Sequence, residues 1–309
     1  MNRDLRRFGD GSDQFFNAAD KNKTYVSRLQ CVQAAIDQQI NMMASGAAQR
    51  KVGVVTFNGE VQVIGDGTKD PQTITGDHLN DYKWLEDNGK AQSAERLTMG
   101  IGESKQSLIN QISAIEETGP TALGPGVLTA VAMASTGKPG STVVICTDGL
   151  ANIGLGAFDE CETEEQFQQV ETFYEKVGQL AQASGVTINV VSIEGDECNI
   201  DSLSKLAELT GGNVERVNPT TLTQQFANML SVPVIATKVE SRVKLHKGLQ
   251  FRNELQENLS EDRTILGRKF GNVTAETVFT FEYGMKPISE LLNYDDLDMT
   301  KLTHLPFQT

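Results

Sequence analysis

The sequence is poor in basic residues and has no long apolar run. Its 309 residues include 27 Lys and Arg against 41 Asp and Glu, which gives a formal net charge of −14 and a pI of about 4.7. Nucleic acids and anionic membrane surfaces are bound through basic patches, so this balance argues against both kinds of partner. No apolar run reaches the length of a membrane span, and residues 1–20 contain no signal-peptide core. We therefore expect no membrane insertion.

Cysteine and histidine are also scarce. The cysteines have no paired spacing, and two of them fall in predicted core elements, which is typical of reduced thiols in a cytoplasmic protein. The sequons at Asn22, Asn258 and Asn272 are then chance matches. The histidines are scattered in polar surroundings, so we expect no metal or catalytic role for them. Spacing for a soft-metal site is absent, including at the Asp-Glu-Cys triplets 159–161 and 196–198. These residues are Cys31, Cys146, Cys161, Cys198, His78, His246 and His304.

The glycine-rich motifs of common nucleotide sites are missing. Gly137-Lys138 is followed by Pro139 and lacks the upstream glycine of a P-loop, and no Gly-x-Gly-x-x-Gly opens a helix after a first strand. A metal-dependent hydrolase would need a base beside the metal, and only Asp159 and Glu160 fall near the one candidate loop. We therefore expect no enzyme activity.

The most informative stretch is Ser141–Gly156. Val143–Cys146 is an apolar run without alternation, as in a strand buried on both faces of a parallel sheet. It ends in Thr147-Asp148-Gly149 and a glycine-rich loop that contains Asn152. Open α/β sheets bind their ligands at this end of a central strand, so Asp148 is a candidate binding residue. Gly149 and Asn152 are expected to shape the loop.

Strands alternate with helices from Lys51 to Leu230. This order predicts an α/β fold with a doubly wound, mostly parallel sheet, right-handed crossovers and one antiparallel edge hairpin at Asn58-Gly59. Capping boxes at Ser27 and Thr163 start two helices, and Gly185 ends the second. The predicted strands are 51–57, 61–64, 141–146, 186–193 and 214–217. Besides the helix that Thr163 starts, the predicted helices are 25–43, 103–117, 127–135, 200–209 and 220–230. Residues 65–102 are expected to be a polar surface loop with room for a short helix.

The chain divides into three parts. Residues 1–24 are polar without periodicity and are predicted to be a disordered lead-in. Residues 25–232 form the α/β domain. In residues 233–309 the period changes to two, and the alternation over 239–245 and 273–283 predicts a partial β-sandwich-like region followed by a tail.

Several dispersed pieces resemble a von Willebrand factor A (vWA) domain and occur in that family's order. They are VGVVTFNGEVQVIG, GPTALGPGVLTA, VVICTDGLANIG and IDSLSKLAELTGGNVERV. More loosely, TYVSRLQCVQAAIDQQI and GNVTAETVFTFEYG look like the A-domain region of circularly permuted Ras-like proteins. These in turn are similar to the trunk domains of vesicle-coat components. The resemblance implies a Rossmann-like fold and a role in protein–protein interaction.

The resemblance also implies a metal-ion-dependent adhesion site (MIDAS) for Mg²⁺, which prefers hard oxygen ligands. Thr121 matches the family's threonine, a direct hydroxyl ligand, and Asp148 matches its aspartate, which acts mainly through water. An acidic side chain of a protein partner would complete the coordination at the top of the sheet. The alternatives are that Thr121 caps the following helix and that Asp148 only closes its strand in a turn.

The family's first strand and its Asp-x-Ser-x-Ser loop have no counterpart before Tyr25. Asp10-Gly11-Ser12-Asp13 imitates the loop, but the three arginines upstream of it exclude a buried strand. The missing strand belongs beside Ser141–Cys146. Its loss would leave backbone N–H and C=O groups of the neighbouring strand unpaired, and two helices would have no strand to pack against. We therefore expect a truncated piece of a longer protein that binds Mg²⁺ weakly or not at all.

These observations predict a non-enzymatic protein-interaction module of vWA type with a degenerate or truncated adhesion site. The alternative is a fragment of a larger Ras-like GTPase or coat-type protein whose nucleotide site lies outside this chain.

Overall fold

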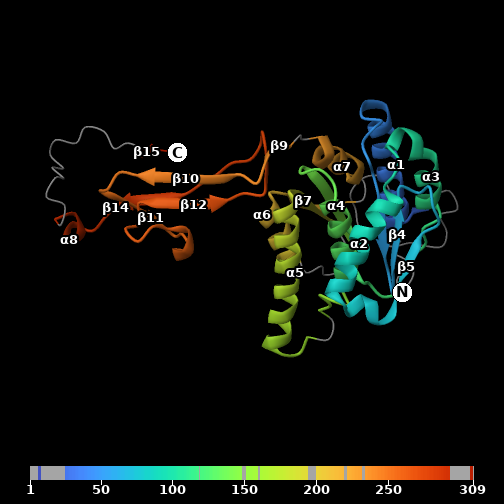
Figure 1. Ribbon diagram of the computed structural model, residues 1–309, viewed down its shortest axis with the longest axis horizontal. Helices are drawn as coiled ribbons and strands as arrows, with labels where there is room; N and C mark the ends of the chain where they lie inside the picture. The colour runs from blue at the N-terminus through green and yellow to red at the C-terminus, as the bar shows by residue number, and fades with distance from the viewer. Residues whose placement is uncertain are drawn as a thin grey trace.

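The computed structural model describes residues 6–7, 25–117, 119–147, 151–158, 161–193, 200–218, 221–231, 234–292 and 307–308. These residues form an α/β body and a tail of antiparallel strands. The tail, orange to red in Figure 1, extends away from one side of the body.

The strands of the body form two sheets of three. β6 (Ser141–Thr147), β7 (Val186–Ile193) and β8 (Val214–Val217) pair in parallel in that order. β3 (Val54–Phe57), β4 (Val61–Gly65) and β5 (Gln72–Ile74) pair antiparallel. The predicted α/β class and the hairpin at Asn58-Gly59 are confirmed. The single continuous sheet is not, because no ladder joins β3 to β6 among the described strands.

Helices cover β7 on both faces, so that the body has three layers. Ile188 and Val190 pack with α4 (Leu123–Ser135), α5 (Glu164–Ser184) and α6 (Ile200–Thr210). Val191 and Ile193 pack on the other face with α1 (Arg28–Gly46) and α7 (Leu222–Ser231), and α3 (Ile101–Ser113) lies against α1. Successive strand residues point to opposite faces, and helices cover both faces of β7, so all eight of its positions are buried, including the polar Thr187, Asn189 and Ser192.

Both predicted capping boxes are present. Ser27 Oγ accepts from the Gln30 amide at 3.1 Å, and Gln30 Oε1 accepts from the Ser27 amide at 2.9 Å, so α1 begins at Arg28 rather than at the predicted Tyr25. Thr163 and Gln166 make the same pair of bonds at the start of α5. That helix ends at Gly185, whose φ of 69° is the left-handed conformation that glycine adopts at low cost.

The prediction of a surface loop over residues 65–102 is wrong. This segment contains β5, the short helix η1 (Gly76–Asn80) and the fifteen-residue helix α2 (Tyr82–Arg96). The sequence of α2 shows little apolar periodicity, because the buried face of the helix consists of Leu85, Gly89, Gln92 and Ser93. A Cβ on Gly89 would lie 2.7 Å from Ala132 Cβ, so glycine allows close packing of α2 on α4.

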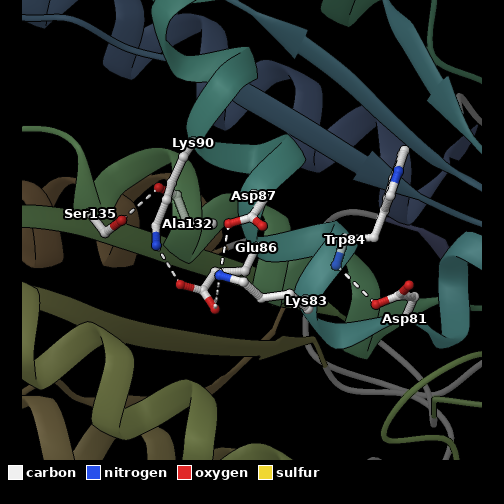
Figure 2. A network of polar contacts seen from close by, with 8 residues as sticks. All are labelled: Asp81, Lys83, Trp84, Glu86, Asp87, Lys90, Ala132 and Ser135. Carbon is white, nitrogen blue, oxygen red and sulfur yellow. Dashed lines mark hydrogen bonds and ion pairs between the residues drawn. The ribbon is translucent and has the colours of Figure 1, made fainter.

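The other face of α2 is polar and carries charged pairs (Figure 2). Lys83 contacts Asp87 at 2.9 Å, and Lys90 pairs with Glu86. Asp81 caps the helix by accepting from the Trp84 amide at 2.9 Å. Such pairs at i, i+4 spacing stabilise a helix that has little apolar surface of its own.

The tail is made of short strands that pair antiparallel as β12-β10-β15, β11-β14 and β13-β9. A small core of Val243, Leu245, Leu249, Phe251 and Leu266 lies between them. The elements are β9 (Val234–Thr237), β10 (Glu240–Leu245), β11 (Leu249–Arg252), η2 (Gln256–Asn258), β12 (Ile265–Lys269), β13 (Asn272–Thr274), β14 (Glu282–Met285), α8 (Ile288–Leu291) and β15 (Phe307–Gln308).

Two predictions about the ends of the chain need correction. The alternating segment 273–283 is not one strand, because β13 stops at Thr274, where Thr277 Oγ1 accepts from the Thr274 amide at 2.9 Å and closes a turn. The predicted disordered lead-in contains β1 (Arg6–Arg7), which pairs with β2 (Tyr25–Val26). The rest of residues 1–24 lies outside the described part.

Asn272 joins the tail to the body. Its Nδ2 donates to Gly185 O at 2.8 Å and to Thr187 Oγ1 at 2.7 Å, both at the start of β7. The residue is 1% exposed, which agrees with the prediction that its sequon is a chance match. The tail is therefore attached at the end of the parallel sheet opposite the loops that follow β6 and β7.

Candidate functional site

Two loops meet at the edge of the body where β3 and β6 end, hereafter the carboxyl edge. Asn152 Oδ1 accepts from the Thr121 amide at 2.5 Å, and the Asn152 amide donates to Thr121 O at 3.1 Å. This reciprocal pair fixes the loop before α4 against the loop after β6. As predicted, Asn152 shapes its loop, and it does so by holding a residue 31 positions away.

The alternative reading of Thr121 as a helix cap is wrong. Helix α4 starts from Ala122, and no side chain caps it. The Ala122 amide instead donates to Asn58 O at 2.7 Å, so the β3–β4 turn also supports this loop. The Thr121 side chain is half-buried, and its hydroxyl has no hydrogen-bond partner among the residues that the structure describes.

The loop 151–158 is fixed on three sides. The Phe158 amide closes it by donating to Ala151 O at 2.8 Å, and the Leu155 amide donates to Leu79 O at 3.0 Å. Tyr174, from α5, donates its hydroxyl to Gly156 O at 3.1 Å. A Cβ on Gly124 would lie 1.9 Å from Leu155 O, so only glycine allows α4 to lie this close to the loop.

The described residues do not make a cation site by themselves. β6 reaches the carboxyl edge at the buried Thr147, but Asp148 and Gly149 lie outside the described residues, as does Asp10-Gly11-Ser12-Asp13. Within the described ranges no three His, Cys, Asp or Glu side chains come together. Of the two predicted ligands, the structure places only the Thr121 hydroxyl, and one hydroxyl is too few donors for Mg²⁺.

The described histidines lie in other places. His78 stacks on Trp84 with ring centroids 3.8 Å apart, and His246 Nδ1 accepts from the Gly248 amide at 3.1 Å. His304 lies outside the described residues. Both described rings therefore have local structural contacts.

Cys31, Cys146 and Cys161 form no disulfide bond among the described residues. Cys31, on α1, lies in the core that α1 and α7 form over β7, and burial raises the pKa of its thiol. Cys161 donates to Ala157 O at 3.5 Å. Cys198 and both acidic pairs next to Cys161 and Cys198 lie outside the described residues. No helix in the described ranges is long and apolar enough to cross a membrane.

A cavity of about 1610 Å³ runs down from the carboxyl edge between the two sheets. Thr121, Thr147 and Asn58 line one end of it, and Lys138, Gly140 and Val234 line the other. The cavity follows β6 along its whole length, so we call it the central groove.

Comparison with known proteins identifies relatives of this chain. The Sec23/Sec24 trunk domain matches residues 22–231. The chain is 33% identical over 270 residues to circularly permutated Ras protein 1 of Dictyostelium discoideum. That alignment covers 87% of this chain and 31% of the relative, so the chain spans about a third of the relative's length. The expected resemblance to coat-protein trunk domains and to circularly permuted Ras-like proteins is confirmed.

Solved structures show likeness of fold. The human COPII-coat protein Sec24c matches with a TM-score of 0.50 and 12% identity, over 83% of this chain and 37% of that one. Proximal thread matrix protein 1 from the mussel byssus, with a zinc-occupied MIDAS motif, matches with a TM-score of 0.40 and 16% identity, over 66% of this chain and 42% of that one.

Proposed function

The chain belongs to the Sec23/Sec24 trunk domain family, and on that premise we propose that it is a non-enzymatic protein-interaction module of vWA type. Its contact surface is the carboxyl edge, where loops 119–122 and 151–158 meet. The observation that carries this proposal is the half-buried Thr121 hydroxyl, which the Asn152 pair holds in place and which has no described partner. A cytoplasmic location fits the reduced thiols.

The partner presents an acidic side chain. A threonine hydroxyl donates one hydrogen bond, and a carboxylate is the acceptor that strengthens such a bond most. The adhesion site is degenerate in this chain, because residues 1–309 contain no Asp-x-Ser-x-Ser sequence to add to Thr121 and Asp148. Contact with the partner is therefore expected to proceed without a tightly bound cation.

An array of synthetic peptides tests the acidic partner. Each peptide carries one central Asp, and a matched array carries Asn in its place. We expect Asp peptides to bind the chain more tightly, and Thr121→Val to weaken their binding at least about tenfold, since hydrogen bonds to charged groups contribute roughly 1.5–3 kcal/mol. Thr172→Val, an exposed threonine within α5, is the matched control. Equal binding of both arrays, or equal binding by the two variants, contradicts the proposal.

Calorimetric titration with Mg²⁺ and Mn²⁺ tests the degenerate site. We expect no binding tighter than roughly millimolar, because without the Asp-x-Ser-x-Ser loop Thr121 and Asp148 leave most of the octahedral ligands to water. Tight binding that Asp148→Ala abolishes would falsify this part of the proposal. It would also show that Asp148, outside the described residues, completes an adhesion site.

A second candidate is a part of a larger Ras-like GTPase, which the identity to circularly permutated Ras protein 1 favours. The nucleotide site of such a protein would lie outside this chain, so the two are distinguished on a longer protein from the same gene. Guanine nucleotide released from that longer protein on heat denaturation would favour the second candidate, and none is expected from this chain in either case. Hydrolytic turnover that requires Mg²⁺ and is lost in Asp148→Ala would instead point to an enzyme.

A further inference from the structure

His78, on η1, and Trp84, at the start of α2, form a stacked pair of rings, hereafter the aromatic pair. Their ring centroids lie 3.8 Å apart, and the angle between the ring planes is 16°. Trp84 is half-buried and packs against the core of the body, whereas His78 is exposed. The indole therefore covers one face of the imidazole and leaves the outer face open to solvent.

The backbone on both sides holds the aromatic pair in place. Leu79 is 2% exposed, and its carbonyl accepts from the Leu155 amide at 3.0 Å. The Asp81 amide donates to His78 O at 3.3 Å, and the Asp81 carboxylate accepts from the Trp84 amide at 2.9 Å (Figure 2). Both rings are thus positioned before a partner arrives, which lowers the entropy cost of binding to them.

The side chains around the aromatic pair are acidic. Asp77 is exposed and makes no hydrogen bond or ion pair in the described part of the chain. Asp81 uses one carboxylate oxygen for the Trp84 amide, and its other oxygen has no described partner. Lys83, the nearest basic residue in the sequence, pairs with Asp87 at 2.9 Å. Carboxylate oxygens without a described partner therefore flank the aromatic pair.

An open ring face beside carboxylates favours a planar cation. The guanidinium group of arginine stacks on aromatic rings, and its N–H groups donate to carboxylates at the same time. The ammonium group of lysine is more strongly hydrated and has no plane to stack. A nucleotide base also stacks on aromatic rings, but Asp77 and Asp81 repel the phosphates that accompany it. The chemistry of the pair thus selects arginine.

We propose that the aromatic pair is a binding site for an arginine side chain of a partner protein. The guanidinium group lies on the outer face of His78, and its N–H groups donate to Asp77 and Asp81. Because η1 is hydrogen-bonded to loop 151–158, this site adjoins the carboxyl edge. The inference goes beyond the proposed function, since it requires neither the Thr121 hydroxyl nor an acidic residue of the partner.

Trp84 is the single tryptophan of the sequence, so its fluorescence reports on this site. Three capped glycine peptides that differ at one central residue are titrated into the full chain. The central residue is arginine, lysine or citrulline, which has nearly the shape of arginine but no charge. We expect the arginine peptide to change the Trp84 emission saturably. It should bind about threefold more tightly than the lysine peptide and about tenfold more tightly than the citrulline peptide.

Three results would overturn the proposal. The first is an arginine peptide that gives no saturable change in Trp84 emission. The second is equal affinity for the arginine and lysine peptides, because that result means attraction to the net charge of −14 without stacking. The third is tighter binding of a peptide with central phenylalanine, because the aromatic pair would then select an uncharged ring.

Matched substitutions locate the site. His78→Ala removes the open ring face, and His246→Ala removes a histidine of the tail. Asp77→Asn removes a flanking carboxylate, and Asp70→Asn does so at an exposed position before β5. We expect His78→Ala and Asp77→Asn to weaken the arginine peptide at least about threefold, and both controls to leave its affinity unchanged.

A third substitution separates stacking from stability. His78→Phe keeps a flat ring on Trp84 and should retain the preference for arginine over citrulline. Affinities are taken from the peptide concentration at half the fluorescence change, because the substitutions also alter the starting emission of Trp84. Urea unfolding shows which variants are folded. If His78→Ala is not, then His78→Phe and Asp77→Asn decide, and equal effects of Asp77→Asn and Asp70→Asn overturn the proposal.

Discussion

β7 and β3 have similar apolar sequences and very different surroundings. β7 reads VTINVVSI and is buried at all eight positions, whereas β3 reads VVTF and is buried at none of its four. The difference lies in their neighbours, because β7 has a strand on each side and β3 has one. An apolar run therefore shows that a strand can be buried on both faces, and the number of paired neighbours decides whether it is.

The largest effect is expected where the two strands are compared directly. Val190→Ala removes two methyl groups from a fully buried site on β7 and should lower the free energy of unfolding by about 2–3 kcal/mol. Val55→Ala makes the same change at a half-buried site on β3 and should cost about 1 kcal/mol or less, because less apolar surface is re-exposed. Urea unfolding measures both. Equal costs would mean that the groove is as well packed as β7.

The next largest effect is the loss of stability of the antiparallel sheet as the pH falls. Asp66, just after β4, is fully buried and accepts from the amides of Thr68, Thr98 and Met99 at 2.9–3.1 Å. Burial raises the pKa of Asp66, but these bonds and that from the Thr68 hydroxyl outweigh it, so the net pKa is lowered. A lowered pKa means that the carboxylate stabilises the fold above its unfolded pKa of about 3.9, and that this stability is lost as the pH falls through the folded pKa.

Asp66→Asn should therefore cost about 2 kcal/mol at pH 7 and flatten the acid limb of the stability curve. Asp70→Asn, at an exposed position nearby, is the control and should have little effect. Urea midpoints between pH 3 and pH 7 test this, and hydrogen exchange should show β3 and β4 opening before β7 as the pH falls. Simultaneous opening of the antiparallel and parallel sheets would contradict the prediction that acid opens the antiparallel sheet first.

A smaller effect is expected at the junction between β7 and the tail. Asn272→Ala removes the amide that donates to Gly185 O and Thr187 Oγ1, and leaves both without that donor. We expect a loss of about 1.5 kcal/mol in urea unfolding, typical of removing one partner from buried hydrogen bonds. Asn258→Ala, at the second sequon in the tail, is the control. A loss at Asn258 as large as that at Asn272 would exclude the junction as the cause.

The smallest effects are expected at the two capping boxes. One starts α1, which lines the central groove beside β3, and the other starts α5, which packs on β7. Ser27→Ala and Thr163→Ala each remove a side chain that caps a helix start, at about 1 kcal/mol each. Exchange in the first turn should rise more for α1, which covers the groove, than for α5. Thr172→Ala, within α5, is the control. An equal rise in both first turns would show that the groove does not loosen α1.

Much of the body could be predicted from local signals. The run at β7, both capping boxes, Gly185 and the Asn58-Gly59 turn each depend on residues close together in the sequence. The unpaired edge of β6 was also predicted, from the lack of an apolar run in residues 1–24.

The remaining features depend on contacts between distant residues. Helix α2 escaped prediction because its buried face contains Gly89, Gln92 and Ser93 rather than an apolar stripe, and its fit is set by α4. The pairing of Asn152 with Thr121 joins residues 31 positions apart, and no spacing rule predicts it. The side-chain turn that ends β13 at Thr274 interrupts an otherwise regular alternation.

The attachment of the tail at Asn272 has a mechanical consequence. Both hydrogen bonds of its amide group end at the first residues of β7, the strand with the most complete packing in the body. The tail in Figure 1 is thus tied through a buried side chain to the strand at the centre of the parallel sheet, at the end away from Thr121. A pull on the tail would therefore be felt first at the start of β7, before it reached the carboxyl edge.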